Sequence, residues 1–238
     1  IYNIPEKQII LGYGGEDILK QVVHCFLSGK EKQKTLLIPK FSWWYYKSIA
    51  DEVEGRSVLY PLYEEGNTFK YDFEAMKEAI RKENPDTTME VLIPDFQGRT
   101  DLVQQVIDAG PEVISHNLET VRRLSDSVRS RATYEVSLKV IGQIAASQCV
   151  AKSGIMLGLG ETREEILETM DDLRNVGCQV MTIGQYLQPT AKNTEVKEYI
   201  RPEVFEEYKE IGLRKGFTFV ESGPLVRSSY HAERHIKK

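Results

Sequence analysis

Polar residues and glycines follow several apolar stretches of this chain, at places where a bound ligand could be held. Residues 115–117 (Ser-His-Asn) set three hydrogen-bonding side chains directly after an apolar run, and residues 152–162 carry three glycines near the end of another. A glycine backbone approaches a ligand closely and directs N–H groups at it. Residues 184–190 and 223–230 are two further segments of this kind. The chemistry indicated is ligand binding by hydrogen bonds and close backbone contact.

The cysteines and histidines do not form a metal-binding pattern. The sequence has three widely separated cysteines, Cys25, Cys149 and Cys178. Without a C-x-x-C pair, this spacing is typical of reduced, buried thiols. His116 has no second histidine or cysteine at ligand spacing, so we favour a hydrogen-bonding role for it over a metal site. His231 and His235 fall in a basic C-terminal tail and are expected to be solvated.

An alternation of strands and helices must position these segments. The predicted strands are residues 8–11, 35–38, 57–62, 90–93, 113–115, 150–157, 180–186 and 217–221. The predicted helices are residues 17–27, 42–53, 71–81, 134–145, 163–176 and 202–213. Continuous apolar strands that alternate with amphipathic helices predict an α/β fold with a parallel sheet. Since ligands bind at the carboxyl ends of such strands, we expect the polar segments to meet there.

Length and charge limit the classes of partner. A chain of 238 residues suffices for one large α/β domain or two small ones. The net charge of −5 gives no basic surface for nucleic acid, so no nucleic-acid partner is expected. No apolar run approaches membrane-spanning length, so we expect no membrane association and a cytoplasmic protein. The chain begins at Ile1 instead of Met, as processing or an excised fragment would each give.

Five strings in the C-terminal part identify a family. They are V-L-I-P-D-F-Q-G (91–98), H-N-L-E-T-V (116–121), G-L-G-E-T (158–162), Q-Y-L-Q-P-T (185–190) and R-S-S-Y-H-A (227–232). In this order they resemble lipoyl synthase, a radical S-adenosylmethionine (SAM) enzyme, over about Met89 to Lys238. The resemblance implies a fragment of a partial (β/α) TIM-type barrel. It also implies a sulfurtransferase of lipoate biosynthesis, which inserts two sulfur atoms at C6 and C8 of an octanoyl chain. The implied partner is an octanoylated lipoyl-domain protein or H protein.

The resemblance also implies cofactors and residue roles. The family uses SAM and two [4Fe–4S] clusters, one that cleaves SAM and an auxiliary one that donates sulfur. The serine ligand of the auxiliary cluster falls on Ser229, with Arg227 beside it. The residues expected around SAM are Asn117, Tyr134, Ser137, Gly154, Met156, Gly158, Glu161 and Gln188. For Asn117, Tyr134, Ser137 and Gln188, a helix-capping, core or turn role is an equal alternative.

One departure from the family affects activity. The first half of a lipoyl synthase carries two cysteine triplets, and this sequence has neither. Six of the seven expected protein ligands of the two clusters are therefore missing, and Ser229 alone does not assemble a cluster. We expect the chain as it stands to be inactive or nearly so.

The N-terminal part carries different motifs. Residues 10–19 place a glycine turn before a predicted helix, and residues 37–45 a strand before an aromatic turn. They resemble the fold-type-I pyridoxal-phosphate (PLP) aminotransferases, the group that includes histidinol-phosphate aminotransferase. This implies three βα units of an aminotransferase-like large domain and a vestigial PLP site at Gly14, Gly15, Glu16 and Phe41. Plain helix packing would explain the same residues, and the family's Schiff-base lysine is not identifiable.

Two domains are therefore expected, an aminotransferase-like fragment at 1–86 and a lipoyl synthase-like half at 87–238. The seam is expected within residues 79–88, where the sequence suits both families. We interpret the chain as an accidental chimera of two unrelated genes. Three functions remain open: an inactive lipoyl synthase, a PLP-binding aminotransferase-like protein, and a non-catalytic binding module.

Overall fold

The computed structural model divides into two compact units, Ile1–Thr87 and Thr88–Lys238. It describes residues 20, 35–39, 45–52, 56–60, 62–65, 68–71, 73–83, 88–129, 132–231 and 234–235. None of the helices in these ranges is long and apolar enough to cross a membrane.

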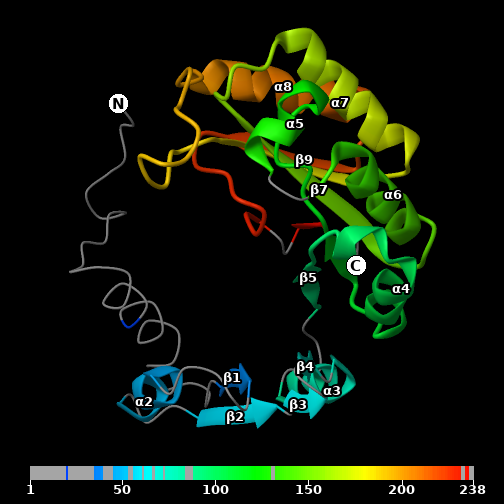
Figure 1. The fold of residues 1–238 in the computed structure, drawn as a ribbon, viewed down its shortest axis with the longest axis vertical. Helices are drawn as coiled ribbons and strands as arrows, with labels where there is room; N and C mark the ends of the chain where they lie inside the picture. The colour runs from blue at the N-terminus through cyan, green and yellow to red at the C-terminus, as the bar shows by residue number, and fades with distance from the viewer. Residues whose placement is uncertain are drawn as a thin grey trace. The chain divides into compact units, whose positions relative to one another are not determined.

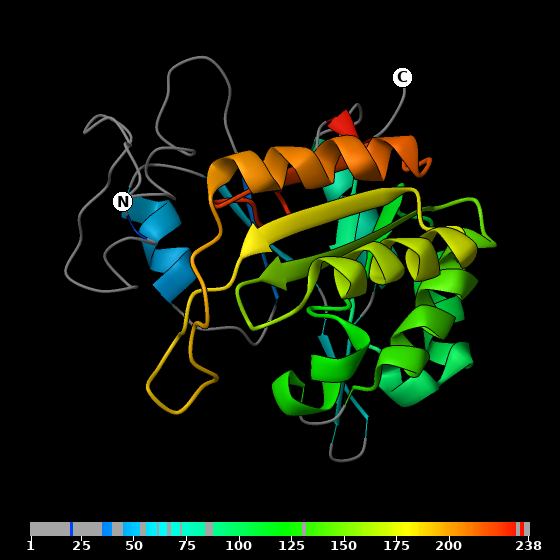
Figure 2. The same ribbon diagram turned by 90° about the horizontal axis from the view of Figure 1, so that it is seen from above.

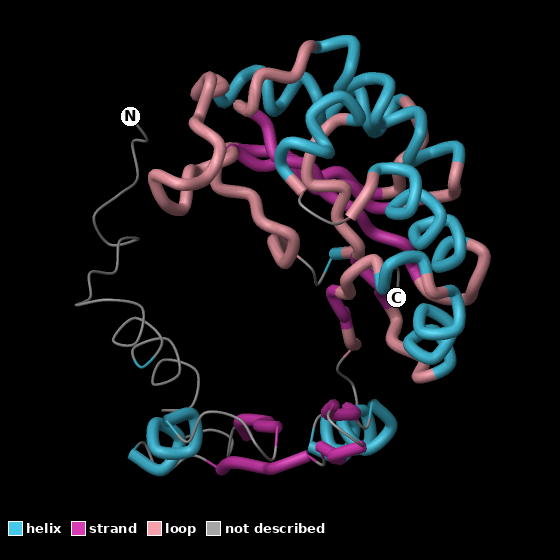
Figure 3. Tube along the Cα trace, in the orientation of Figure 1, coloured by secondary structure: helices cyan, strands magenta, loops and turns pink. Residues whose placement is uncertain are grey.

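The described elements of the first unit are short (Figure 3). They are β1 (Thr35–Pro39), α2 (Tyr45–Glu52), β2 (Arg56–Tyr60), β3 (Leu62–Glu65), β4 (Thr68–Tyr71) and α3 (Phe73–Glu83). Strands β1 and β2 pair in parallel, as expected for a βαβ unit. Strands β3 and β4 form an antiparallel hairpin that the sequence analysis did not predict. The expected strand 8–11 lies outside the described residues, and of the expected helix 17–27 only Lys20 is described, in helical conformation.

The second unit contains one parallel sheet in the order β5-β6-β7-β8-β9. Its strands are β5 (Glu90–Leu92), β6 (Val113–Ser115), β7 (Val150–Leu157), β8 (Val180–Gln185) and β9 (Phe219–Gly223). Its helices are η2 (Phe96–Gly98), α4 (Thr100–Asp108), α5 (Arg122–Val128), α6 (Tyr134–Ala145), α7 (Arg163–Asn175) and α8 (Pro202–Arg214). The predicted α/β class, with a parallel sheet of alternating strands and helices, is confirmed. Helices α4 and α5 were not among the predicted elements.

Helices cover one face of this sheet (Figures 1 and 2). Strand residues such as Ile114, Ile155 and Ile183 belong to one core together with the apolar sides of α4, α6, α7 and α8. This core also holds Cys149 and Cys178, which are free and buried. Consecutive strands are neighbours in the sheet, and each is connected to the next through the same helical layer, so all five strands run in the same direction. The carboxyl ends of the strands therefore share one edge.

The opposite face of the sheet carries both polar and apolar residues, and we call it the inner face. Alternation along the paired strands assigns Glu90, Lys152, Gly154, Thr182 and Glu221 to it. The segment after β9 runs along this side of the sheet, away from the helices (Figure 1). We call its described residues, 224–231 and 234–235, the C-terminal strap.

The burial of His235 differs from what the sequence predicts. His235 was expected to be solvated, but its side chain is fully buried against the inner face. The reason is tertiary: the basic tail folds back onto a sheet face that carries Glu90 and Glu221, so its polar residues find partners there.

A capping box fixes the turn between β7 and α7. The Thr162 side chain accepts a hydrogen bond from the Glu165 amide, and the Glu165 carboxylate accepts one from the Thr162 amide. This satisfies two amide groups that a helix start otherwise leaves unpaired. The glycine-rich segment 158–162 is thereby held at the carboxyl end of β7.

Candidate functional site

A cavity of about 110 Å³ lies where β6, β7 and β8 end. Three residues that the resemblance assigns to the SAM pocket line it, namely Asn117, Gly154 and Met156. From the other side the strap contributes Arg227 and Ser228. The cavity thus joins strand ends and C-terminal strap, which are far apart in the sequence.

Two glycines allow the strands, the loop after β6 and the strap to lie close together around the cavity. A Cβ atom at Gly154 would collide with Thr182 Oγ1 and would lie 3.2 Å from Asn117 Oδ1. A Cβ atom at Gly184 would collide with the backbone oxygen of Val226 in the strap. Any larger residue at either position would displace a cavity-lining neighbour. The glycines therefore set how closely sheet, loop and strap come together.

Glu119, which the sequence analysis did not single out, contributes a carboxyl group to the cavity. Its φ of 68° is left-handed, and its backbone is fixed by hydrogen bonds from its N–H to Gly154 O (3.0 Å) and from Met156 N–H to its oxygen (2.8 Å). Burial raises the pKa of this carboxyl, while the Asn117 side chain and the Arg129 charge oppose the shift. Asn117 Oδ1 is buried and has no partner within the described ranges. The loop thus presents acceptor oxygens to a ligand with hydroxyl or amino donors.

Two other polar residues support this loop from behind. Ser137 accepts a hydrogen bond from Arg129 Nη1 at 2.7 Å, so it lies under the loop and does not line the cavity. The His116 ring is buried, and its Nδ1 lies 2.9 Å from Ile93 O. Burial lowers the pKa of His116, which favours the neutral ring. His116 therefore has the hydrogen-bonding role expected of it.

Gly158, Glu161 and Gln188 shape loops beside the cavity. The Glu161 carboxylate accepts hydrogen bonds from the amides of Gly158 (2.6 Å) and Leu159 (2.9 Å). Gly158 has a φ of 102°, where residues with a side chain are strained. Gln188 Nε2 donates to Asn193 O at 2.9 Å within the β8–α8 loop. None of the three lines the cavity.

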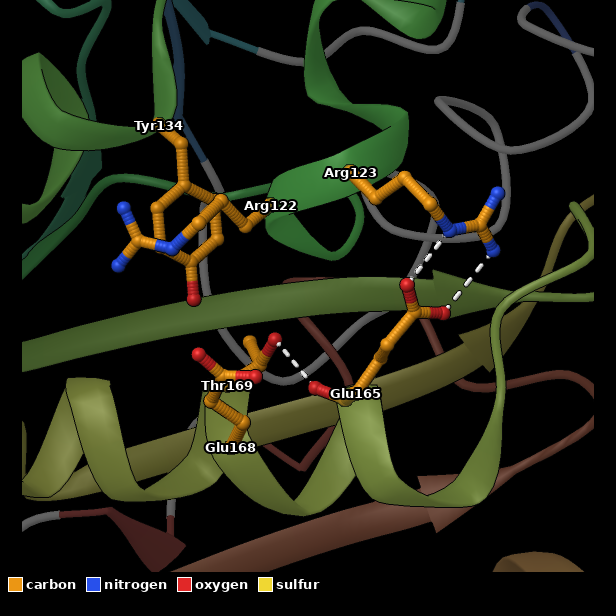
Figure 4. A pocket seen from close by; sticks show the side chains of 6 residues that line it. All are labelled: Arg122, Arg123, Tyr134, Glu165, Glu168 and Thr169. Carbon is orange, nitrogen blue, oxygen red and sulfur yellow. Dashed lines mark hydrogen bonds and ion pairs between the residues drawn. The ribbon is translucent and has the colours of Figure 1, made fainter.

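Tyr134 belongs to a second pocket, of about 180 Å³, on the helical layer (Figure 4). Its hydroxyl donates to Asp172 Oδ2 at 3.0 Å, and the Arg122 guanidinium lies 4.4 Å from its ring centre. Burial raises the pKa of the Tyr134 hydroxyl. Beside it, Arg123 binds both carboxylate oxygens of Glu165, at 2.6 and 3.0 Å. The structure therefore separates Tyr134 from Asn117 and Gly154.

The residues expected near an iron–sulfur cluster do not form a metal site. Ser229 and Arg227 are exposed on the strap, and Arg227 donates to Val226 O at 2.8 Å. Cys178 donates to the backbone oxygens of Ala151 and Val180, and burial raises the pKa of its thiol to about 12. Within the described ranges, no three histidine, cysteine, aspartate or glutamate residues are grouped to hold a metal ion. These residues therefore do not fit a [4Fe–4S] cluster, which normally needs thiolate ligands.

The residues assigned to a vestigial PLP site are Gly14, Gly15, Glu16 and Phe41. All four lie outside the described residues.

Comparison with known proteins first defines the class. Residues 61–173 match the family model described as the radical SAM superfamily, and residues 2–94 match that of aminotransferase class I and II. The chain therefore carries an aminotransferase signature and a radical SAM signature, and the two matches overlap at residues 61–94. The resemblances expected for the two halves are both confirmed.

The particular relatives are lipoyl synthases. That of Treponema denticola is 75% identical over 158 residues, which cover 66% of this chain and 54% of the relative. That of Bacteroides fragilis is 66% identical over 158 residues (66% and 55%), and that of Porphyromonas gingivalis 62% over 160 residues (67% and 57%). The C-terminal part of the chain is homologous to lipoyl synthases. The chain spans about half the length of the curated relatives it matches.

Solved structures give a weaker likeness. The PLP-bound C–S lyase from Staphylococcus hominis has a TM-score of 0.30 at 14% identity, covering 51% of this chain and 32% of that chain. An aminotransferase from Anaerococcus prevotii has a TM-score of 0.28 at 16% identity, covering 51% and 32%. At these values the likeness carries no conclusion about the fold or the site.

Proposed function

We propose that residues 88–238 form the SAM-binding part of a lipoyl synthase. The observation that carries this proposal is the meeting of Asn117, Gly154 and Met156 with Arg227 and Ser228 in one cavity. Asn117, Arg227 and Ser228 belong to strings that resemble those of lipoyl synthases, and the five residues come from separate elements. In parallel α/β folds, ligands bind at this edge of the sheet.

The chemistry of the lining suits a nucleoside with a charged tail. Glu119 and Asn117 offer acceptor oxygens for hydroxyl or ammonium groups, and Met156 offers apolar contact. Arg227 supplies a cation for a carboxylate. A volume of about 110 Å³ is below the 300 Å³ or more typical of sites that enclose a whole ligand, so the cavity holds one end of such a molecule.

In this family SAM supplies the group that abstracts hydrogen from the octanoyl chain. What the chain itself does is bind and orient this molecule at the strand ends and shield it with the strap. We propose no further step, because the described residues do not fit the iron–sulfur clusters on which the reaction depends. Sulfur insertion therefore needs cluster ligands beyond those that the described residues supply.

The partner and the compartment follow from the same proposal. An octanoylated lipoyl-domain protein or H protein would be the acceptor of a complete enzyme, and the cytoplasm is the compartment we propose. PLP binding ranks second, supported by the family match of residues 2–94 alone. A non-catalytic binding module ranks third.

SAM binding by the purified chain, measured by isothermal titration calorimetry, tests the first proposal. We expect the wild type to bind SAM and Gly154→Ala to lose at least about tenfold in affinity, because the added methyl group pushes Thr182 or Asn117 into the cavity. The matched control is Gly142→Ala in helix α6, where the new Cβ would lie 3.6 Å from Val176 Cβ, an ordinary contact. Circular dichroism checks that each variant folds. Equal affinities of wild type and Gly154→Ala, or no binding by the wild type, would contradict the proposal.

A further inference from the structure

The C-terminal strap is attached to the inner face at two places. The first is at the carboxyl ends of the strands, where the backbone of Val226 packs against Gly184 and Arg227 Nη1 donates to Gln185 O at 3.4 Å. Val226 is buried there. This attachment lies next to the cavity, because Val226, Arg227 and Gly184 all line it.

The second attachment is at His235, near the amino ends of the strands. His235 Nδ1 lies 3.2 Å from Lys152 Nζ and 3.9 Å from Glu90 Oε2. Its ring centre is 5.9 Å from that of Phe219, at the start of β9. The side chains of His235 and Lys152 have no exposed surface. Ser229 is placed in the sequence between the two attachments.

The Lys152 ammonium needs three acceptors because it has three protons and no contact with water. Glu90 accepts two of its hydrogen bonds, at 2.8 and 2.9 Å. The third falls to His235 Nδ1, since a lysine ammonium only donates. A buried charge with an unpaired proton is strongly unfavourable. His235 therefore completes the coordination of an ion pair that is built into the sheet.

The charges around this cluster agree with that arrangement. Burial raises the pKa of the Glu90 carboxyl, but its neighbours, with Lys152 as hydrogen-bond donor and nearby cation, hold it below its usual value, so the carboxylate is ionised. Arg234, the neighbour of His235, lies 3.9 Å from Glu221 of β9. Two adjacent strap residues thus meet inner-face carboxylates on two strands.

We propose that His235 is a positioning residue: by accepting the third hydrogen bond of Lys152 it fixes the far end of the strap, and so holds Arg227 and Ser228 at the cavity. This inference rests on the proposed function only in naming the cavity as a SAM site. The hydrogen bonding of the strap itself is independent of any ligand.

Hydrogen–deuterium exchange of the full chain, followed by mass spectrometry, measures how firmly the strap is held. In the wild type, the amides of Val226 and Tyr230 are bonded to Gly223 O and Arg227 O. We expect His235→Ala to speed exchange in the strap by roughly tenfold or more, the size that loss of a hydrogen bond to a charged group gives, with β7 and β8 unchanged. His235→Asn, which restores an acceptor near the position of Nδ1, should return exchange to within about threefold of wild type. Unchanged strap exchange in His235→Ala would overturn the proposal.

Two controls separate the specific contact from a general effect. His231→Ala removes the other strap histidine, which packs edge-on against Tyr230, and should leave strap exchange as in wild type. In the neutral pair Glu90→Gln with Lys152→Met, a further His235→Ala change should add less than about twofold, because the hydrogen bond is already gone. The proposal would be overturned if His231→Ala sped strap exchange as much as His235→Ala does. It would also be overturned if His235→Ala had the same effect in the neutral pair as in the wild type.

SAM binding is measured on the same variants. If the wild type binds no SAM, the proposed function fails, while the exchange result still decides the role of His235. If the wild type binds SAM and His235→Ala frees the strap, we expect the SAM affinity to fall by roughly tenfold, through loss of preorganised Arg227. If His235→Ala frees the strap and leaves the SAM affinity unchanged, His235 does not position the strap residues for SAM binding.

Discussion

Glu119 illustrates how a single residue is forced into a strained conformation at the candidate site. A non-glycine residue with a φ of 68° is uncommon, and the surrounding structure has to impose it. Here the imposed contacts are the two backbone hydrogen bonds to Gly154 and Met156 on β7. They turn the Glu119 carboxyl towards the cavity and away from open water. The strain is therefore linked to the placement of a functional group.

The raised pKa of Glu119 predicts a pH-dependent stability. Burial penalises the ionised carboxylate, so the folded pKa lies above the unfolded one. The neutral form is favoured on folding, and that contribution is present below the unfolded pKa and lost as pH rises through the folded pKa. We expect Glu119→Gln to match the wild type at acid pH and to be more stable at pH 8. The gain should be about 1 kcal/mol or less, because Asn117 and Arg129 offset part of the penalty.

Thermal unfolding at both pH values measures this difference. Glu168→Gln is the control, since Glu168 is exposed on α7 and a surface substitution changes stability by less than about 0.5 kcal/mol. A stabilisation by Glu119→Gln that is equal at both pH values would show that the carboxyl charge is not its cause.

Sequence patterns predicted some site residues and not others, for reasons visible at single positions. Asn117 follows β6 and Gly154 lies within the neighbouring strand β7, so the pairing of these two strands brings both residues to the cavity. Tyr134 and Ser137 sit on α6, and the direction of a helix residue depends on its neighbours in three dimensions. Glu119 requires a left-handed backbone that no local signal announces. His235 is buried only because the tail meets Lys152.

At the level of elements, the loop between β8 and α8 depends on one buried side chain. Gln185 Nε2 donates to the backbone oxygens of Tyr186 and Glu198, both at 3.0 Å, and its Oε1 accepts from the Ile200 amide at 2.9 Å. Gln185 is fully buried, so water does not replace these bonds. The amide group of Gln185 therefore holds both ends of the loop that spans residues 186–201.

Gln185→Glu is expected to destabilise the second unit by about 1–3 kcal/mol, since it removes both donors and sets a carboxylate against two carbonyl oxygens. Urea unfolding monitored by circular dichroism measures the change. The matched control is Gln188→Glu, whose amide donates to Asn193 O at the surface and which should cost less than about 0.5 kcal/mol. Equal effects of the two substitutions would mean that the loop is not held by Gln185.

The elements themselves differed in how well the sequence predicted them. Strands β6 and β7 have the predicted bounds, although β7 carries the buried polar residues Lys152 and Ser153 between its apolar ends. The β3–β4 hairpin was missed: the predicted strand ends at residue 62 and the predicted helix begins at residue 71, although Gly66-Asn67 is a two-residue hairpin signal. Helix α5 has seven residues, too few for a periodic pattern to emerge.

At the scale of the whole molecule, two family signatures occur in one chain. The aminotransferase match ends at residue 94 and the radical SAM match begins at residue 61, while the two compact units divide between Thr87 and Thr88. That division falls in the segment where the sequence suits both families. The chain matches only about half of each lipoyl synthase, so the reaction of those enzymes stays a proposal for it.

Iron binding is the property in which this chain should depart most from its relatives. Of its three cysteines, Cys149 and Cys178 are buried in the helix-covered core, and the thiol pKa of Cys178 is raised to about 12. A cluster needs several accessible thiolates at one place. After anaerobic treatment with iron and sulfide, we expect far less than one cluster per chain, and the same small amount in Ser229→Ala. Iron analysis and visible absorbance measure this, and about eight bound iron atoms per chain, the content of two [4Fe–4S] clusters, would refute it.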